Sequence, residues 1–242
     1  MIPLRDTIRS RTIPLVNVAF IALNALVFIF ELSLSPQGLE RFIMTFGMVP
    51  ARLHLTEPLA LLQNPLVLIT LFSHMFMHGG WVHFLSNMWT LFIFGDNIED
   101  RMGHRRYLIF YVFAGLASGL LQALVAPGSR VPAIGASGAI AGVLGAYFIL
   151  YPGGRVVTLI MLVFIPWFVE IPAIIYLGFW FVTQLFSGLA ALNTPGAANM
   201  GGVAWWAHIG GFLFGVFVHR LFLRQAPMSY YYQPPRYPDD PF

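Results

Sequence analysis

"GASGAIAGVLGAY", residues 135–147, consists of small and aliphatic residues, with one hydroxyl near its start at Ser137. On a helix, Gly138, Gly142 and Gly145 would fall within about 60° of one another, next to Ser137. A stripe of small residues lets other backbones pack closely against a central helix. Serine is itself common in such interfaces, so this stretch alone favours a packing role for Ser137 over a catalytic one.

The composition indicates that this helix lies in a membrane. Of 242 residues, 58% are hydrophobic and only 10% are charged, a balance that no soluble domain of this size requires. Several apolar runs approach the roughly 20 residues that a helix needs to cross the bilayer. Strand alternation is absent, so we predict an all-α integral membrane protein with six transmembrane helices. These are expected at about 13–33, 70–98, 104–126, 137–152, 171–191 and 204–224.

Arginine sets the expected orientation, because all 13 positively charged residues are Arg. An N-in/C-in topology places ten of them inside, namely Arg5, Arg9, Arg11, Arg101, Arg105, Arg106, Arg155, Arg220, Arg224 and Arg236. It leaves Arg41, Arg52 and Arg130 outside, as the positive-inside rule favours. The arginines flank spans and form no continuous stripe, so we expect no nucleic-acid partner.

The rest of the chain is organised around these spans. Residues 1–12 are predicted to be a cytoplasmic segment, 13–225 the membrane domain, and 226–242 a disordered tail rich in Pro and Tyr. We expect the first span to be a retained helix rather than a signal peptide. The apolar stretch 156–168 is too short to span and is predicted to be interfacial or re-entrant. With no cysteine, disulfides and cysteine catalysis are excluded.

Polar side chains within spans are costly unless paired, so they identify candidate functional positions. In "HMFMHGGWVHFLSNMW", residues 74–89, His83 and Asn87 are four apart and would project from one helix face. His74 and His78 are interpreted as helix caps that satisfy outer-loop carbonyls. A zinc site is the alternative, but no nearby carboxylate or cysteine completes a ligand set, so we predict no metal.

A third polar position lies in the last span, in "AWWAHIGGFLFG", residues 204–215. Gly211 and Gly215 share the helix face of His208 and would let another helix approach closely. The imidazole is therefore expected to point at a neighbouring helix rather than at lipid.

The length of the helix that begins at Ser137 favours catalysis. A helix from Ser137 to Pro152 would be about 24 Å long, roughly 6 Å short of the hydrocarbon thickness. The preceding residues, 125–136, contain two prolines and two glycines, so irregular backbone must reach membrane depth. Such backbone is tolerated only beside protein or a water-filled cavity. A wet hollow over a serine at a helix N-terminus suits hydrolysis.

We therefore predict a Ser–His dyad, with Ser137 as nucleophile and His208 as general base and then general acid. No Asp or Glu lies in the outer halves of these spans to make a triad. The Ser137 N–H, Asn87 and His83 are candidate oxyanion donors. Gly135 would let the chain turn before the serine. No cofactor is required.

These motifs resemble the rhomboid family of intramembrane serine proteases over about residues 13–224. The matching residues are His83 and Asn87 in H-x-x-x-N, Gly135, Ser137 and Gly138 in GASG, and His208, Gly211 and Gly215 in the last span. "FGDNIEDRMG", residues 94–103, also looks like the family's inner end of the second span, where Glu99 and Arg101 would anchor the next connection. The resemblance implies cleavage of membrane-anchored proteins in or near their transmembrane segments.

The resemblance also implies roles for three further segments. Residues 34–69 would form an outer loop partly in the membrane, the fifth span would gate lateral access of substrate, and residues 193–206 would cap the site. Some members have an aromatic residue one turn after the serine, against which the catalytic imidazole stacks. Here that position is Ala141, so the sequence does not identify the support for His208.

Two other functional classes compete with a protease. A non-proteolytic rhomboid-like protein that binds transmembrane helices would not need Ser137 or His208, and both are present. A proton-relaying transporter would favour an inverted repeat or intramembrane carboxylates, and the sequence shows neither, because Glu31 and Glu170 lie near span ends. For the protease, the expected partners are single-span membrane proteins and the bilayer; the oligomeric state is not determined. The expected location is the plasma membrane of a prokaryote, with the site opening to the extracytoplasmic side.

Overall fold

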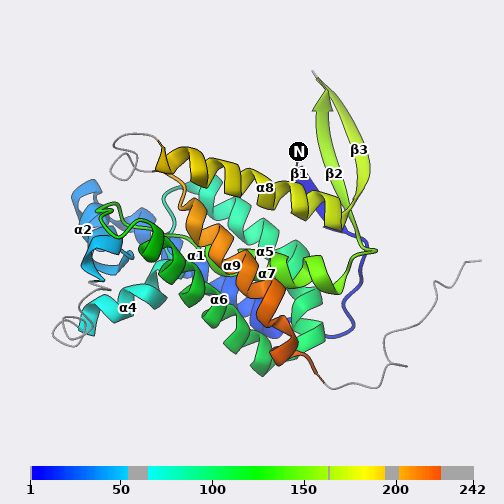
Figure 1. The fold of residues 1–242 in the computed structure, drawn as a ribbon, viewed down its shortest axis with the longest axis horizontal. Helices are drawn as coiled ribbons and strands as arrows, with labels where there is room; N and C mark the ends of the chain where they lie inside the picture. Colours follow the sequence, from blue (N-terminus) through cyan, green and yellow to red (C-terminus); the bar gives the residue numbers. More distant parts are fainter. Residues whose placement is uncertain (1, 54–64, 163, 194–201, 225–242) are drawn as a thin grey trace, which may run out of the picture.

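The structure is a computed structural model that describes residues 2–53, 65–162, 164–193 and 202–224. It is a mostly helical bundle with a small β-sheet at one end (Figure 1). In these residues, three helices are long and apolar enough to cross a membrane: α1 (Leu15–Ser33), α6 (His104–Val125) and α8 (Ala173–Leu192). A bent pair that ends in α5 (Trp81–Met102) can count as a fourth. The expectation of a helical membrane protein is confirmed at this level.

The helix α1 buries polar side chains and exposes apolar ones. Its inner face buries Asn17, Asn24 and Glu31, each at most 2% exposed. Its outer face leaves Leu26 and Ile29 more than 60% exposed. Polar residues inside and apolar residues outside are the distribution expected where hydrocarbon surrounds the protein.

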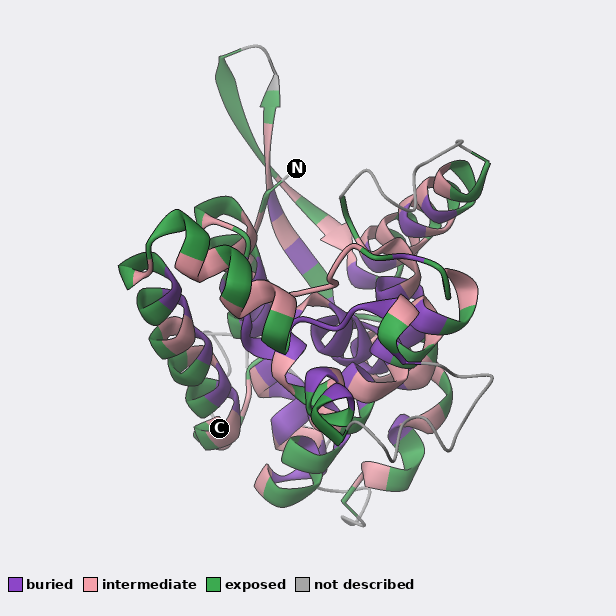
Figure 2. Cartoon of the chain, turned by 90° about the vertical axis from the view of Figure 1, so that its left-hand side faces the viewer, coloured by how far each residue is buried: buried purple, intermediate pink, exposed green. Residues whose placement is uncertain are grey.

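The shorter helix α7 (Ser137–Leu150) lies at the centre of the bundle. Ten consecutive residues, from Gly138 to Tyr147, are buried. They pack against α5, α6, α8 and α9 (Trp205–Val218), and Figure 2 shows the buried residues at the centre and exposed ones on the outer helices. A helix that is apolar all round is stable only when it is enclosed in this way.

Glycines bring α7 and α9 into backbone contact. A Cβ built on Gly211 would lie 1.9 Å from the Gly138 carbonyl oxygen, and one on Gly215 would lie 2.0 Å from that of Gly142. The contact is mutual, because a Cβ on Gly145 would lie 2.1 Å from the Phe212 oxygen. No side chain fits at these points, so glycine sets the separation of the two helices.

The predicted second span, 70–98, is wrong as a single helix. The chain instead forms α4 (Pro65–Ser73) and the 3₁₀ turn η2 (His74–Phe76), followed after a break by α5, with a bend of 79°. Met77 is extended, and Gly80 has a positive φ of 154° just before α5. The break contains His78, Gly79 and Gly80, and the Gly-Gly pair is a turn signal that hydropathy averaged over a long window does not reveal.

The prediction of an all-α fold is also wrong. The strands β1 (Ile2–Asp6), β2 (Arg155–Leu162) and β3 (Ile165–Pro172) form an antiparallel sheet in the order β1-β2-β3. In the register, Ile2 lies opposite Leu159, and Val156 lies opposite Ile171. The run 155–160 is rich in β-branched residues, which favour strands. Its partner β1 is distant in sequence, so a local pattern could not predict the pairing.

The remaining elements close the two ends of the bundle. The helix α2 (Pro36–Phe46) and the turn η1 (Pro50–Arg52) belong to the predicted outer loop, and Met48 pairs with Ala133 in the segment before α7. The turn η4 (His219–Phe222) ends the described chain. Residues 194–201 of the predicted cap and the tail 226–242 lie outside the described residues.

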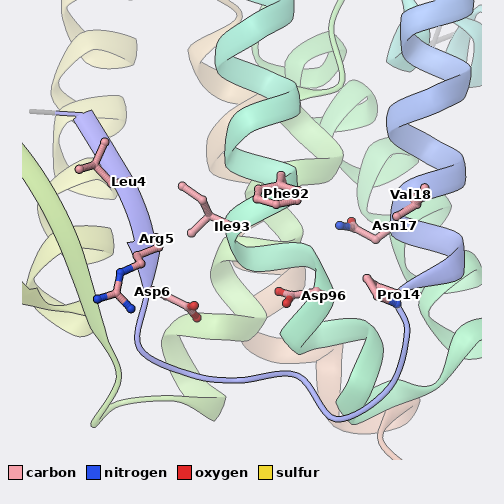
Figure 3. A pocket seen from close by; sticks show the side chains of 9 residues that line it. All are labelled: Leu4, Arg5, Asp6, Pro14, Asn17, Val18, Phe92, Ile93 and Asp96. Carbon is pink, nitrogen blue, oxygen red and sulfur yellow. The ribbon is translucent and has the colours of Figure 1, made fainter.

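The end of the bundle where α5 meets α6 holds a polar network. Glu99 accepts hydrogen bonds from the Val16 and Asn17 amides, at 2.9 and 2.7 Å, and contacts His104 Nδ1 at 2.5 Å. A cavity of about 160 Å³ opens beside it between β1, α1 and α5, with Asp6 and Asp96 on its wall (Figure 3). The Glu99 contacts join α1, α5 and α6, and Asn97 Nδ2 on α5 donates to Asp6 Oδ2 on β1 at 2.8 Å.

The glycine contacts predict a specific loss of stability. Gly211→Ala and Gly215→Ala each place a methyl group on a backbone oxygen of α7, so the helices must separate. We expect each to lower the free energy of unfolding by about 1–3 kcal/mol. Gly153→Ala is the control, because a Cβ there meets nothing within 4 Å. Thermal unfolding in detergent measures the change, and equal melting temperatures for all three variants would contradict the contact.

Asp6, in the N-terminal strand, predicts a pH dependence. Burial raises the pKa of its carboxyl from 3.8 to about 6; the Tyr147 hydrogen bond opposes the rise and Asp96 adds to it. Because the folded state holds this proton more tightly, stability falls as the pH rises from about 4 to about 6 and then levels. Asp6→Asn cannot ionise, so the melting temperature of the variant relative to that of the wild type should rise as the pH increases across this window. A gap that stays constant from pH 4 to 7.5 would contradict the assignment.

Candidate active site

Ser137 and His208 meet at the same end of α7 and α9. His208 Nε2 lies 2.8 Å from Ser137 Oγ, and the imidazole is buried. Each residue lies in the first turn of its helix, so the glycine-mediated contact of the two helices brings the side chains together. At this distance a hydroxyl proton can pass to a neutral imidazole.

Gly135 turns the chain just before Ser137. Its φ is +126°, a conformation that other residues rarely adopt, and its N–H donates to the His74 carbonyl at 2.8 Å. A Cβ at this position would lie 2.6 Å from His83 Nε2. The absence of a side chain at 135 therefore lets the His83 ring lie against the segment that carries Ser137.

The candidate oxyanion donors lie on two elements. Ser137 is the first residue of α7, so its N–H has no acceptor within the helix. Asn87, on α5, is 6% exposed, and its Nδ2 has no hydrogen-bond partner in the structure. A buried amide without an acceptor is costly, and an anionic ligand oxygen would remove that cost. His83, on the same face of α5, accepts a 3.4 Å hydrogen bond from the Gly79 amide at Nδ1.

His74 and His78 lie behind the site rather than in it. The backbone N–H of His78 donates to both oxygens of Glu31, at 3.3 and 3.1 Å, and its ring packs edge-on against His83. His74 lies in η2 and is 3% exposed. The carboxylate of Glu31, on α1, is thus near the histidines, which the sequence did not indicate. Within the described residues, no three His, Asp or Glu side chains are grouped as metal ligands.

Sequence reasoning missed the support of His208. Gln184, on α8, is buried, and its Oε1 lies 2.8 Å from His208 Nδ1. The Trp180 ring lies 5.8 Å from the imidazole at 32°, and the Trp205 ring lies at 6.3 Å and 88°. These contacts fill the role left open by Ala141. The signal was available, because Gln184 carries the sole side-chain amide in the apolar stretch 173–192.

Comparison with known proteins agrees with this fold and these motifs. Residues 65–225 match the family model of the Rhomboid domain. The chain belongs to the rhomboid family, as its motifs indicated.

Curated relatives give the range of similarity. RHOMBOID-like protein 5 of Arabidopsis thaliana is 40% identical over 77 residues, 31% of this chain and 25% of that protein. The human Presenilin-associated rhomboid-like protein, mitochondrial, is 29% identical over 163 residues, 64% of this chain and 37% of that protein. RHOMBOID-like protein 4 of Arabidopsis thaliana is 32% identical over 145 residues, 60% and 32% of the two chains. The chain spans less than two-fifths of the length of these relatives.

The turn at Gly135 predicts a sharp effect on the site. Gly135→Ala would strain the backbone and push a methyl group into the His83 ring, so we expect the reactivity of Ser137 to fall at least about tenfold. Gly80→Ala is the matched control, since Gly80 also has a positive φ but a Cβ there meets nothing within 4 Å. The rate of Ser137 labelling by a fluorophosphonate measures the effect. Equal rates for the two variants would remove the steric role of position 135.

Proposed function

We propose that this protein is an intramembrane serine endopeptidase that hydrolyses peptide bonds in or near transmembrane segments of membrane-anchored proteins. The observation that carries the proposal is the 2.8 Å contact between His208 Nε2 and Ser137 Oγ within a helical membrane bundle. Membership of the rhomboid family supports it.

The chemistry proceeds in two halves. His208 takes the proton of Ser137 as the hydroxyl oxygen attacks the scissile carbonyl carbon, and the carbonyl oxygen becomes an oxyanion. The imidazolium then gives that proton to the leaving amine as the C–N bond breaks, which leaves an acyl-enzyme. In the second half His208 activates a water that hydrolyses the ester and restores Ser137.

Three groups would stabilise the oxyanion. They are the Ser137 N–H, the Asn87 amide and the His83 imidazole, and the support for His83 is that a Cβ at position 135 would lie 2.6 Å from its Nε2. Donors fixed in advance cost no reorganisation when charge develops, which is the source of their catalytic effect. The unpartnered Nδ2 of Asn87 is the strongest support for this assignment.

For the membrane arrangement we propose six spans with an N-in/C-in topology and the site opening to the extracytoplasmic side. Two hydrogen bonds support this topology, because each joins two segments that it places inside. Arg224 N donates to the Arg101 carbonyl, and Arg155 N donates to Thr7 Oγ1. In this arrangement α8 would gate lateral access of substrate from the bilayer. The proposed prokaryotic plasma membrane rests on the arginine bias alone; the human relative is named as mitochondrial.

The proposal is tested by cleavage of a single-span substrate in liposomes. Ser137→Ala and His208→Ala should abolish cleavage, because the first removes the nucleophile and the second removes the general base. Asn87→Ala should lower the rate by about 10²–10³ without abolishing it, since other donors remain. Asn24→Ala is the control, as Asn24 is also buried but lies in α1 and donates to the Phe20 carbonyl.

Two outcomes would overturn the assignment. Cleavage by Ser137→Ala or His208→Ala at the wild-type rate would refute the dyad. A wild type that binds the substrate helix in liposomes but never cuts it would favour the alternative, a non-proteolytic rhomboid-like protein. An unchanged rate in Asn87→Ala would remove that residue from the oxyanion site.

A further inference from the structure

The side of the imidazole that faces away from Ser137 is held by a neutral amide on a different helix. His208 lies in α9, whereas Gln184 lies in α8, and the 2.8 Å contact joins Nδ1 to Oε1. Both side chains are buried, so water does not compete for this bond. The contact is independent of the family motifs, because those motifs contain Ser137, His208 and the α5 residues His83 and Asn87 but not Gln184.

The local structure of α8 fixes which end of the amide faces His208. Gln184 Nε2 donates to the Trp180 carbonyl at 3.2 Å and to Thr183 Oγ1 at 3.1 Å. Thr183 Oγ1 can accept, because its own proton goes to the Trp180 carbonyl at 2.6 Å. With the amide nitrogen facing two oxygens, Oε1 is the atom that faces the imidazole. An amide oxygen can only accept.

This orientation determines the tautomer of His208. A neutral imidazole has one N–H, and the acceptor at Nδ1 requires the proton there. Nε2 is then left with its lone pair toward Ser137 Oγ, as a general base needs. If the proton moved to Nε2, Nδ1 and Gln184 Oε1 would face each other as two acceptors with no proton between them, and Nε2 would point its proton at the serine.

We propose that Gln184 is a positioning residue that holds His208 in the Nδ1–H tautomer, so that the site works as a dyad oriented by a neutral amide. The proposal rests on the proposed function for its catalytic consequence. Gln184 takes no part in bond making, since an amide cannot accept the proton. Trp180, whose ring lies beside the imidazole, limits rotation of the ring out of this position.

Matched variants separate orientation from packing. Gln184→Met keeps the length of the side chain but removes the acceptor, whereas Gln184→Glu retains an acceptor. Gln122→Met is the control: Gln122, on α6, accepts from the Ala207 amide at 3.2 Å and so bonds the same turn of α9 without touching the imidazole. Thermal unfolding of each variant shows whether it is folded.

The expected result is a selective loss of turnover. Gln184→Met should lower kcat by about 10- to 100-fold with KM changed less than about threefold, and the labelling rate of Ser137 by a fluorophosphonate should fall in parallel. Gln184→Glu should recover most of kcat. Gln122→Met should lower the melting temperature but should lower kcat far less than Gln184→Met does. Equal kcat for the two Met variants, or a Gln184→Glu variant as slow as Gln184→Met, would overturn the proposal.

A second readout does not depend on catalysis. In the Ser137→Ala background, the ¹⁵N shifts of His208 should show a protonated Nδ1 with Gln184 and a tautomer mixture with Gln184→Met. The same spectrum for both would overturn the inference even if the protein proves to be a protease. A wild type that is inert toward substrate and fluorophosphonate while the tautomer responds would refute the proposed function and leave the role of Gln184 in place.

Discussion

The fold depends on the close contact between α7 and α9. Each helix presents glycine where the other presents backbone oxygen, so the two axes approach more closely than side chains would permit. This contact fixes the depth and rotation of α9 relative to α7, and with them the distance between His208 and Ser137. A hydrogen bond of 2.8 Å between two helices requires such a rigid spacer, because a shift of about 1 Å would break it.

Around this pair, the candidate site draws one or two groups from each of four helices. The α5 helix contributes Asn87 and His83, α7 contributes Ser137, α8 contributes Gln184, and α9 contributes His208. No helix supplies a complete site by itself. In hydrocarbon, polar groups are stable only where they face one another, so the chemistry and the packing of the interior have the same requirement.

The sequence predicted those parts of the molecule that follow from local spacing. Small residues at intervals of three and four in α7 and α9 indicated close packing, and His83, Asn87 and His208 stood out as polar residues in apolar spans. The α5 start was misplaced because hydropathy averaged over a long window passed over the Gly79–Gly80 pair in the break at 77–80. The sheet was missed because the apolar run 156–168, which contributes to the β2–β3 hairpin, was interpreted as an interfacial or re-entrant segment, and because β1 pairs with a strand about 150 residues away. Gln184 met the same criterion as His208, but its partner could be named only once α8 and α9 were placed together. The catalytic roles of Ser137 and His208 stay predictions.

Glu99 lies within the matched domain, but its side chain accepts hydrogen bonds from residues outside it. It is fully buried, and two of its hydrogen-bond donors are the amides of Val16 and Asn17, at the start of α1, where the N-cap residue is a proline that offers no side-chain acceptor. The family match begins only at residue 65, so these donors lie outside it. A shortened chain that starts at the domain boundary would leave the Glu99 carboxyl buried without its two backbone donors. The folded unit of this chain is therefore larger than the domain by which it is recognised.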